Sequence, residues 1–359
     1  MLEATRREAA ELYVLFSLLS RTELALGDAE GKAGGMVPVV MILRREHDGM
    51  RRYCVEESEI HLLGEHIDKR VPREEFTKAA ELLRKALAAA GNPIDLSDLE
   101  PFLDTLSIYD MEAQTDDRTD LHLVLWDERN RPVGIRIQSR LAGYLPLLDG
   151  GRAANIKYEQ TGIRFSGPAV HKINWSDEDG DVSEVARRIL YIESMGGVLK
   201  FSDMADKIFK SNLLLLDTNM PRILASMVMA LHIDGISRIS DLADMLEQKN
   251  PLKVKDELVR KHGFYRYKLR QLLLAAAWVM RPTKQWDGQP SAIAGYIMVD
   301  GDGEMLLYTR ADEPVFADYL FTHTRIEKGS PEGDRYGLLE RENGAYYLKL
   351  NLKISLTKR

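Results

Sequence analysis

Two runs of residues in the middle of the chain, in which apolar side chains recur at every second position, constrain its fold more than any other feature. The first run is Leu121–Trp126 and the second is Val133–Arg140, with a polar turn at Asp127–Pro132 between them. Alternation with a period of two is the pattern of a strand with one buried face. Two such runs around a short polar turn predict a β-hairpin.

Helical and strand patterns alternate before this hairpin. Thr5-Arg6-Arg7-Glu8 has the spacing of a capping box, and the apolar residues behind it predict a helix of about four turns. The segments Met36–Leu43 and Tyr53–Leu62 each predict one strand, and Arg73–Ala90 predicts a second helix. The first hundred residues are therefore expected to be α+β.

The pattern after the hairpin is mostly helical. Beyond an acidic break at Ser176–Asp181, the chain from Val182 to Met280 is predicted to be helical almost throughout. The predicted helices are Phe201–Phe209, Met220–Leu231, Ile239–Gln248, Val254–His262 and Tyr265–Met280. Gly301-Asp302-Gly303 and Asn343-Gly344 predict the turns of two further hairpins, since glycine and asparagine tolerate the positive φ that tight turns require.

Composition limits the environment and the partners. The chain has 359 residues, 56 Asp and Glu against 49 Lys and Arg, and one cysteine, Cys54. The net charge of −7 argues against a surface built for unspecific nucleic-acid binding, although a local basic groove stays compatible with it. A single cysteine, no apolar run near the ~20 residues of a membrane span, and no signal peptide predict a cytoplasmic protein.

Several kinds of site are excluded by their missing motifs. One cysteine and eight scattered histidines do not reach zinc-ligand spacing. The acidic runs Asp177–Asp181 and Asp300–Glu304 lack the later ligands of a calcium loop and are predicted to be solvated turns. The phosphate-binding and nucleophile-elbow motifs GxxxxGK[ST], GxGxxG and GxSxG are absent.

The polar face of the hairpin carries the remaining candidates. Asp120 precedes the first strand, and Arg136, Gln138 and Arg140 share one face of the second. An acid on one strand beside an acid-x-lysine on the next is the layout of PD-(D/E)XK nucleases, which hold Mg²⁺ and a water against a phosphodiester. This pattern alone favours the alternative, an ordinary hairpin with a solvated face.

Ordered blocks of sequence support the nuclease interpretation. These blocks include Glu11-Leu12-Tyr13, Thr119-Asp120, Gly134–Ser139, Ala154–Glu159, Phe264–Lys268, Met280–Pro282, Trp286–Gly288, Phe316–Leu320, Thr324–Glu327 and Leu350–Ile354. In this order they resemble the HpaII-type restriction endonucleases over nearly the whole chain. The resemblance implies an α/β PD-(D/E)XK fold, Mg²⁺ as the cofactor, and cleavage of duplex DNA at a short palindrome, CCGG for the named family.

The resemblance also implies roles for individual residues. Asp120 is expected to bind Mg²⁺ with help from Glu11, for which a plain surface position is an equal alternative. Gln138 stands where the family has its catalytic lysine; an amide can orient a water but brings no positive charge. Arg136 and Arg140 are expected to stabilise the charged transition state, because arginine stays protonated and cannot act as a base.

Other residues are expected to contact DNA. Lys157 and Asn155 lie in one of the blocks, and Lys157 is a candidate replacement for the missing lysine charge, with a solvated lysine as the alternative. Arg325 and Arg335 are candidate readers of guanine, which accepts two hydrogen bonds from arginine. A basic segment with interleaved aromatic residues suits phosphate contact or, alternatively, a salt-bridged helix face. Its basic residues are Lys253, Lys255, Arg260, Lys261, Arg266, Lys268 and Arg270.

The sequence thus predicts a type II restriction endonuclease in three parts. Residues 1–175 are expected to form the nuclease core, residues 176–282 a helical DNA-facing region, and residues 283–359 a β-rich region for recognition. The alternatives are a DNA-binding relative impaired at Gln138 and a purely structural or protein-interaction module. Double-stranded DNA is the expected partner, a palindrome favours a homodimer, and a cognate cytosine methyltransferase is the expected genetic partner.

Overall fold

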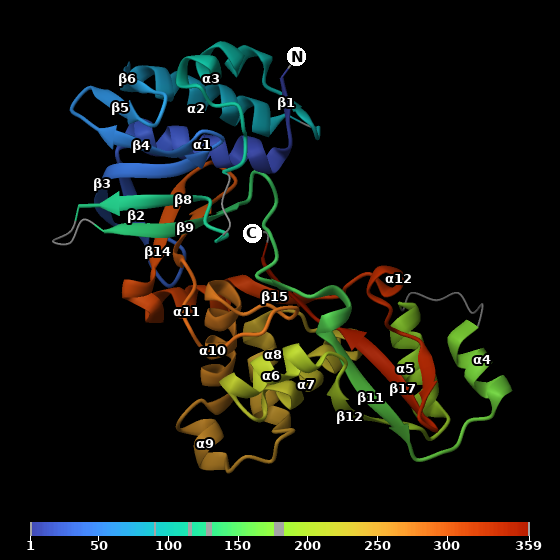
Figure 1. The fold of residues 1–359 in the computed structure, drawn as a ribbon. Coiled ribbons are helices and arrows are strands. Elements are labelled where there is room, and N and C mark those ends of the chain that lie inside the picture. The colour runs from blue at the N-terminus through green and yellow to red at the C-terminus, as the bar shows by residue number, and fades with distance from the viewer. Residues whose placement is uncertain (1, 90, 114–116, 127–130, 176–182, 358–359) are drawn as a thin grey trace. The chain divides into compact units, whose positions relative to one another are not determined.

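The structure of the protein is a computed structural model that describes residues 2–89, 91–113, 117–126, 131–175 and 183–357. Residues 127–130 of the predicted hairpin turn Asp127–Pro132 and the whole acidic break Ser176–Asp181 lie outside these residues. The chain divides into two compact units (Figure 1). The first unit combines Met1–Leu145 with Pro290–Tyr319, and the second combines Pro146–Gln289 with Leu320–Thr357.

These two units differ from the three contiguous parts predicted from the sequence, whose boundaries were at residues 175 and 282. The reason is that the segment Pro290–Tyr319 returns to the first unit. Strand β13 (Ile293–Val299) pairs in parallel with β9 (Pro132–Ser139), more than a hundred residues earlier. Figure 1 accordingly shows β14 (Met305–Thr309), in orange, among the blue and cyan elements of the first unit. The sequence pattern does not reveal that these two segments pair, because each of them has only the pattern of an ordinary strand.

The first unit consists mainly of one large sheet and the helices that cover it. Its other elements are β1 (Glu3–Ala4), α1 (Arg6–Arg21), β2 (Glu23–Gly27), β3 (Ala33–Glu46), β4 (Gly49–Val55), β5 (Glu59–Leu63), β6 (Asp68–Pro72), α2 (Arg73–Ala88), β7 (Ile94–Asp95), η1 (Ser97–Leu99), α3 (Glu100–Leu106), β8 (Leu121–Leu125), η3 (Arg310–Asp312) and the start of α11 (Glu313–His323). The nine-stranded sheet has the order β2-β14-β13-β9-β8-β3-β4-β5-β6. Because β2 also pairs with β3, the pairings of β2, β14, β13, β9, β8 and β3 form a closed circuit.

Helix α1 is the central element of the core. It begins at the predicted capping box, in which Thr5 accepts from the Glu8 amide and Glu8 accepts from the Thr5 amide. The apolar stripe of the helix is buried. The ring of Phe16 makes edge contacts with the rings of Phe76 on α2 and Phe102 on α3, with ring centroids 5.8 Å and 5.5 Å apart. The same core contains Leu121 and Ile135 of the hairpin. Burial of this stripe holds the polar edge of α1 beside β9.

A buried ion pair lies within the same unit. Arg44 and Glu46 are two residues apart on β3, and their side chains are 3% and 0% exposed. Arg44 Nη1 donates to Glu46 at 2.6 Å, and Tyr53 Oη donates to the other carboxylate oxygen at 2.8 Å. Arg44 Nη2 donates to the carbonyl of Met111 at 2.6 Å. Each charge of the pair is therefore compensated by hydrogen bonds.

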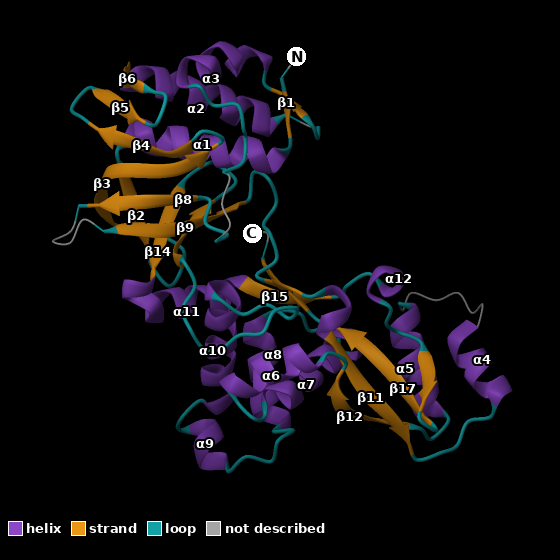
Figure 2. Ribbon diagram, viewed as in Figure 1, coloured by secondary structure: helices purple, strands orange, loops and turns teal. Residues whose placement is uncertain are grey.

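The second unit is mainly helical, with two small sheets (Figure 2). Its elements are β10 (Leu148–Asp149), η2 (Gly151–Ala154), β11 (Asn155–Thr161), α4 (Gly167–Trp175), α5 (Glu184–Ser194), β12 (Val198–Met204), α6 (Lys207–Leu216), α7 (Met220–Ile233), α8 (Ile239–Lys249), α9 (Asp256–Arg260), α10 (Phe264–Trp278), β15 (Thr324–Glu327), α12 (Pro331–Asp334), β16 (Leu339–Glu342), β17 (Ala345–Asn351), β18 (Lys353–Leu356) and the end of α11. The sheet orders are β12-β11-β17-β16 and β10-β18-β15.

Most predicted elements are confirmed, and three are corrected. The segment Tyr53–Leu62 is not one strand, because the polar residues Glu56–Ser58 separate β4 from β5. The predicted helix Phe201–Phe209 begins as strand β12 and becomes helical only from Lys207. The hairpin predicted around Asn343-Gly344 was expected to have Ala345–Leu356 as one strand, but this segment divides into β17 and β18, which pair in different sheets. The mixed α/β class is confirmed, whereas the PD-(D/E)XK core stays a prediction.

Buried His232 on α7 is expected to make the stability of the protein depend on pH. Its side chain is 5% exposed, and within the described residues neither ring nitrogen has a hydrogen-bond partner. Burial, assisted by the charge of Lys328, lowers the pKa of His232 from 6.5 to about 4. A lowered folded-state pKa leaves stability intact above the unfolded pKa and removes it as the pH falls toward the folded one.

We therefore expect acidification from pH 6.5 to about 4 to remove about 3 kcal/mol through this residue, at roughly 1.4 kcal/mol per pKa unit. His232→Phe keeps an aromatic ring and should lose less stability than the wild type over this range in urea unfolding. His262→Phe, at an exposed histidine, is the matched control and should follow the wild type. Parallel pH profiles for wild type and His232→Phe would contradict this assignment.

Within the described ranges, no single helix has both the length and the hydropathy of a membrane span. The pair α6 and α7 meets the criterion only when joined, and it is bent by 108°.

Candidate active site

The site is built at the start of strand β8. Leu121 lies opposite Ile135 and His122 opposite Gly134, which gives the hairpin register that the sequence left open. The Asp120 amide donates to the Ile135 carbonyl at 2.8 Å, and Asp120 Oδ2 accepts from the Ile137 amide at 2.6 Å. The Asp120 side chain is only 8% exposed. Both its backbone and its carboxylate are therefore fixed against β9.

The first helix brings a second carboxylate to the same place. Arg7 Nε lies 2.9 Å from Glu11 Oε1, and Arg7 Nη2 lies 3.7 Å from Asp120 Oδ1. Glu11 is 7% exposed, so it is not the surface residue of the alternative prediction. One guanidinium thus joins an acid on α1 to an acid at the hairpin.

Two members of this cluster were not predicted from the sequence. Arg7 lies one helical turn before Glu11, and this i,i+4 spacing was the available signal. Glu112 lies 3.7 Å from Arg7 Nε, and it comes from a stretch without periodicity that gave no signal.

The electrostatics of the cluster follow from burial. Burial and the neighbouring Asp120 raise the pKa of Glu11, while Arg7 opposes the rise. Burial also raises the pKa of Asp120, against the opposing effects of Arg136, the Ile137 amide and Arg7. Burial disfavours the charge on Arg7, but Glu11, Asp120 and Glu112 outweigh it and raise the Arg7 pKa. A cation between the two buried acids therefore favours their ionised forms.

The other hairpin candidates lie along β9 and just beyond it. Gln138 is 1% exposed, and its Oε1 accepts from the Leu145 amide at 2.9 Å. The oxygen of this amide therefore holds the backbone of the segment that follows the hairpin. Arg136 Nη1 donates to the Arg118 carbonyl at 3.0 Å, while Arg140 lies past the strand end, near Gly301.

The donor set fits a magnesium ion better than a transition metal. No group of three or more His, Cys, Asp or Glu side chains in the described part of the chain could hold a metal ion. Glu11 and Asp120 nevertheless approach one point, the guanidinium of Arg7. Mg²⁺ typically uses one or two protein carboxylates and completes its shell with water and substrate phosphate oxygens. These two carboxylates match that requirement.

Two predicted DNA contacts in the second unit already have protein partners. Lys157 forms an ion pair with Glu342, and its ammonium lies 4.6 Å from the ring centroid of Tyr347. Asn155 Nδ2 donates to the Asp334 carbonyl at 2.8 Å, and its Oδ1 accepts from Asn351 at 2.7 Å. Lys157 therefore has its own counter-ion, which speaks against its role as a replacement for the missing lysine.

The basic segment divides into paired and unpaired residues. Lys268 lies 2.6 Å from Asp217, Arg266 pairs with Asp244 and Glu247, and Lys261 pairs with Glu257. Arg270 lies over the ring of Phe321 at 4.4 Å. In the described ranges, three exposed side chains of this segment form no ion pair, namely those of Lys253, Lys255 and Arg260. These three are the cations left available to an external anion.

The two candidate base readers also differ. Arg325 donates from Nε to Glu327 at 2.8 Å, and Glu327 accepts in turn from Ser355. Arg335 has a left-handed backbone with φ 52° and an exposed side chain, for which the described residues provide no ion-pair partner. It lines an open cavity of about 610 Å³ together with Arg152, Asn155 and Lys349. Arg335 is the more accessible of the two.

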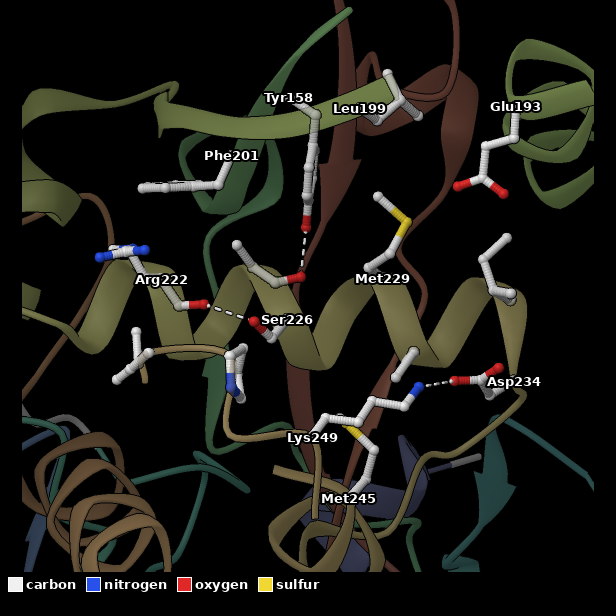
Figure 3. A pocket seen from close by; sticks show the side chains of 15 residues that line it. Tyr158, Glu193, Leu199, Phe201, Arg222, Ser226, Met229, Asp234, Met245 and Lys249 are labelled. Carbon is white, nitrogen blue, oxygen red and sulfur yellow. Dashed lines mark hydrogen bonds and ion pairs between the residues drawn. The ribbon is translucent and has the colours of Figure 1, made fainter. Parts of the chain in front are cut away.

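A separate cavity of about 390 Å³ lies in the second unit (Figure 3). Phe201, Leu199 and Met229 are among its apolar lining residues, and two other lining residues, Lys249 and Asp234, form an ion pair at 3.0 Å. Tyr158 Oη donates across it to the Ala225 carbonyl. None of the predicted site residues lines this cavity.

Comparison with known proteins places the chain in a family. The family model of the HpaII restriction endonuclease matches residues 5–356. The type II restriction enzyme HpaII of Haemophilus parainfluenzae is 30% identical over 357 residues, which cover 97% of each chain. No solved structure matches at a significant level. Homology supports a site-specific nuclease that acts on DNA, and it confirms the resemblance carried by the ordered blocks: the chain belongs to the HpaII restriction endonuclease family.

Proposed function

We propose that the protein is a Mg²⁺-dependent type II restriction endonuclease that hydrolyses duplex DNA at a short palindrome, with CCGG as the expected site. The observation that carries this proposal is the convergence of the buried carboxylates of Glu11 and Asp120 on one cation beside β9. Family membership supports a nuclease, and this convergence supports Glu11 and Asp120 as its metal ligands.

Glu11 and Asp120 would hold the metal ion. When bound there, Mg²⁺ would polarise the phosphate and lower the pKa of an attacking water. The Ile137 amide keeps the Asp120 carboxylate oriented, so the ligand would be preorganised before DNA arrives. Arg136 lies close enough to lower the pKa of Asp120 and would place positive charge beside the reacting phosphate.

Gln138 would have a positioning role. Its carbonyl oxygen accepts from the Leu145 amide, and its NH₂ group would donate to a water or a phosphate oxygen. Arg140, beyond the end of β9, would contact a neighbouring phosphate. In this scheme the positive charge that a lysine would supply comes from arginine.

The exposed cations of the second unit would contact the DNA backbone. Lys253, Lys255 and Arg260 are the basic-segment residues without protein counter-ions in the described ranges, and Arg335 would reach a base edge. Each phosphate contact releases a counter-ion, so backbone contacts are recognised by the salt dependence of binding. Arg325 would read a base only after release from Glu327.

Replacing two of these cations should weaken binding without changing sequence preference. For Lys255→Gln/Arg260→Gln, we expect about tenfold weaker DNA binding and a salt slope lower by about 2, since each phosphate contact contributes roughly 0.9. Fluorescence anisotropy with Ca²⁺ in place of Mg²⁺ measures both quantities. Arg84→Gln/Lys85→Gln on α2 removes the same charge from exposed positions and is the matched control. Equal slopes for both variants would remove this segment from the DNA interface.

The alternative is a DNA-binding relative with impaired cleavage, and Gln138 is the observation that favours it. Incubation of wild type and Gln138→Lys with CCGG-containing DNA and Mg²⁺ or Mn²⁺ discriminates the two. The endonuclease proposal predicts cutting by the wild type. Site-specific binding in Ca²⁺ without cutting by the wild type, together with cutting by Gln138→Lys, would establish the alternative. Failure to bind any duplex would contradict both.

A palindromic site favours a two-fold dimer, and a monomer that cuts the strands in sequence is the alternative. We propose that the enzyme acts in the cytoplasm and is encoded near a cytosine methyltransferase that protects the host DNA.

A further inference from the structure

Arg7 occupies an unusual position among the candidate site residues. Its guanidinium lies 2.9 Å from Glu11, 3.7 Å from Glu112 and 3.7 Å from Asp120. The structure brings these three acids from three separate segments to one side chain. That side chain stands at the point on which the predicted metal ligands converge.

The backbone of Arg7 is held rigidly at this place. The capping box at Thr5 fixes the first turn of α1. The neighbouring Arg6 donates to the carbonyls of Leu141 at 2.8 Å and Ala89 at 3.0 Å, which ties the start of the helix to two other segments. The guanidinium of Arg7 is therefore presented to the acids by a fixed helix, and only its side chain can move.

Exposure is unequal within the cluster. The side chains of Glu11 and Asp120 are each 8% exposed, whereas that of Arg7 is 41% exposed. The buried Arg44–Glu46 pair differs, because both of its members are enclosed. A partly exposed arginine on a flexible stem can turn toward solvent, whereas two buried carboxylates near each other cannot both stay ionised without a cation.

We propose that Arg7 is an internal counter-ion that neutralises Glu11 and Asp120 in the metal-free protein and competes with the divalent cation for them. This proposal rests on the proposed function, since it concerns the same two carboxylates. Arg7 is a positioning residue and not a ligand. Its guanidinium keeps both acids oriented toward one point, and it must move aside before the site is filled.

The test measures metal binding in the absence of DNA. Mn²⁺ affinity is determined by calorimetry at about pH 8 for the wild type, Arg7→Gln and Arg7→Lys, with Arg21→Gln as the control. Arg21 lies on the same helix, is 43% exposed and pairs with Glu304, so its replacement matches the change of charge and exposure. We expect Arg7→Gln to bind Mn²⁺ on the order of tenfold more tightly than the wild type, because the substitution removes a competing positive charge that lies 2.9 Å from the Glu11 carboxylate and 3.7 Å from that of Asp120. Arg7→Lys and Arg21→Gln should bind as the wild type does.

A thermal readout separates this role from a merely structural one. Without metal, Arg7→Gln should melt below Arg21→Gln, and added Mn²⁺ should raise its Tm by more than it raises that of the wild type. Equal or weaker Mn²⁺ binding by Arg7→Gln would overturn the proposal, as would an equal Mn²⁺-induced shift in Tm.

Failure of the proposed function has a different signature. If Arg7→Gln/Asp120→Asn binds Mn²⁺ as tightly as Arg7→Gln, the metal lies elsewhere and the proposed metal site is wrong. Tighter binding by Arg7→Gln that Asp120→Asn abolishes supports both proposals. Absence of Mn²⁺ binding by every variant would overturn both.

Discussion

Asp120→Asn is expected to abolish cleavage while leaving DNA binding intact. The substitution keeps the shape of the side chain, and its amide oxygen can still accept from the Ile137 amide. It removes the negative charge through which Asp120 would hold Mg²⁺ with Glu11. We expect the single-turnover rate of cleavage to fall on the order of a thousandfold.

The folded state should tolerate this change well. Burial raises the pKa of Asp120, so its ionised form costs free energy that a neutral amide does not. Unfolding in urea should therefore show unchanged or slightly higher stability. Asp117→Asn is the matched control, because Asp117 is an exposed acid three residues earlier and should cut at the wild-type rate. Cleavage by Asp120→Asn within a few-fold of the wild type would exclude this residue from the chemistry.

Arg44→Met should produce the largest loss of stability. It would leave Glu46, which is 0% exposed, without its ion-pair partner, and it would leave the Met111 carbonyl without its donor. Removing one member of a buried pair typically costs about 3–5 kcal/mol, because the other charge stays buried and uncompensated. We expect a loss of this size in urea unfolding.

Two further variants test whether the loss of stability comes from the uncompensated charge of Glu46. Arg44→Met/Glu46→Leu removes both charges and should be more stable than Arg44→Met alone. Arg45→Met changes the exposed neighbour on the same strand and should alter stability by less than about 0.5 kcal/mol. A single variant no less stable than the wild type, or a double variant less stable than Arg44→Met, would contradict the assigned role of the pair.

The sequence predicted individual helices and strands better than it predicted which of them pack or pair with each other. The hairpin and the capping box of α1 were visible because each depends on residues that are close in the chain. The parallel pairing of β13 with β9 and the division into two units were not visible, since they depend on contacts between distant segments. The register that places Asp120 beside Ile137 was open for the same reason, because the turn between the strands did not fix it.

The charged residues show the same limit. Asp120 and Glu11 were predicted as a pair through family resemblance, and the structure brings them together through Arg7. The basic segment looked like one patch because the partners of Arg266 and Lys268, Asp244 and Asp217, lie outside it in the sequence. Counting charges within a segment cannot reveal counter-ions that the fold supplies from elsewhere.

Cleavage of a short duplex that contains one CCGG site tests the proposed endonuclease activity most directly. A duplex of equal composition with the site permuted to GCGC is the control, and both are incubated with Mg²⁺ or with EDTA. We expect Mg²⁺-dependent scission of both strands at one position within CCGG, with 5′-phosphate ends, and an intact control duplex. An intact CCGG duplex in both Mg²⁺ and Mn²⁺, or scission in EDTA, would contradict the proposal that the protein is a metal-dependent restriction endonuclease that cuts at CCGG.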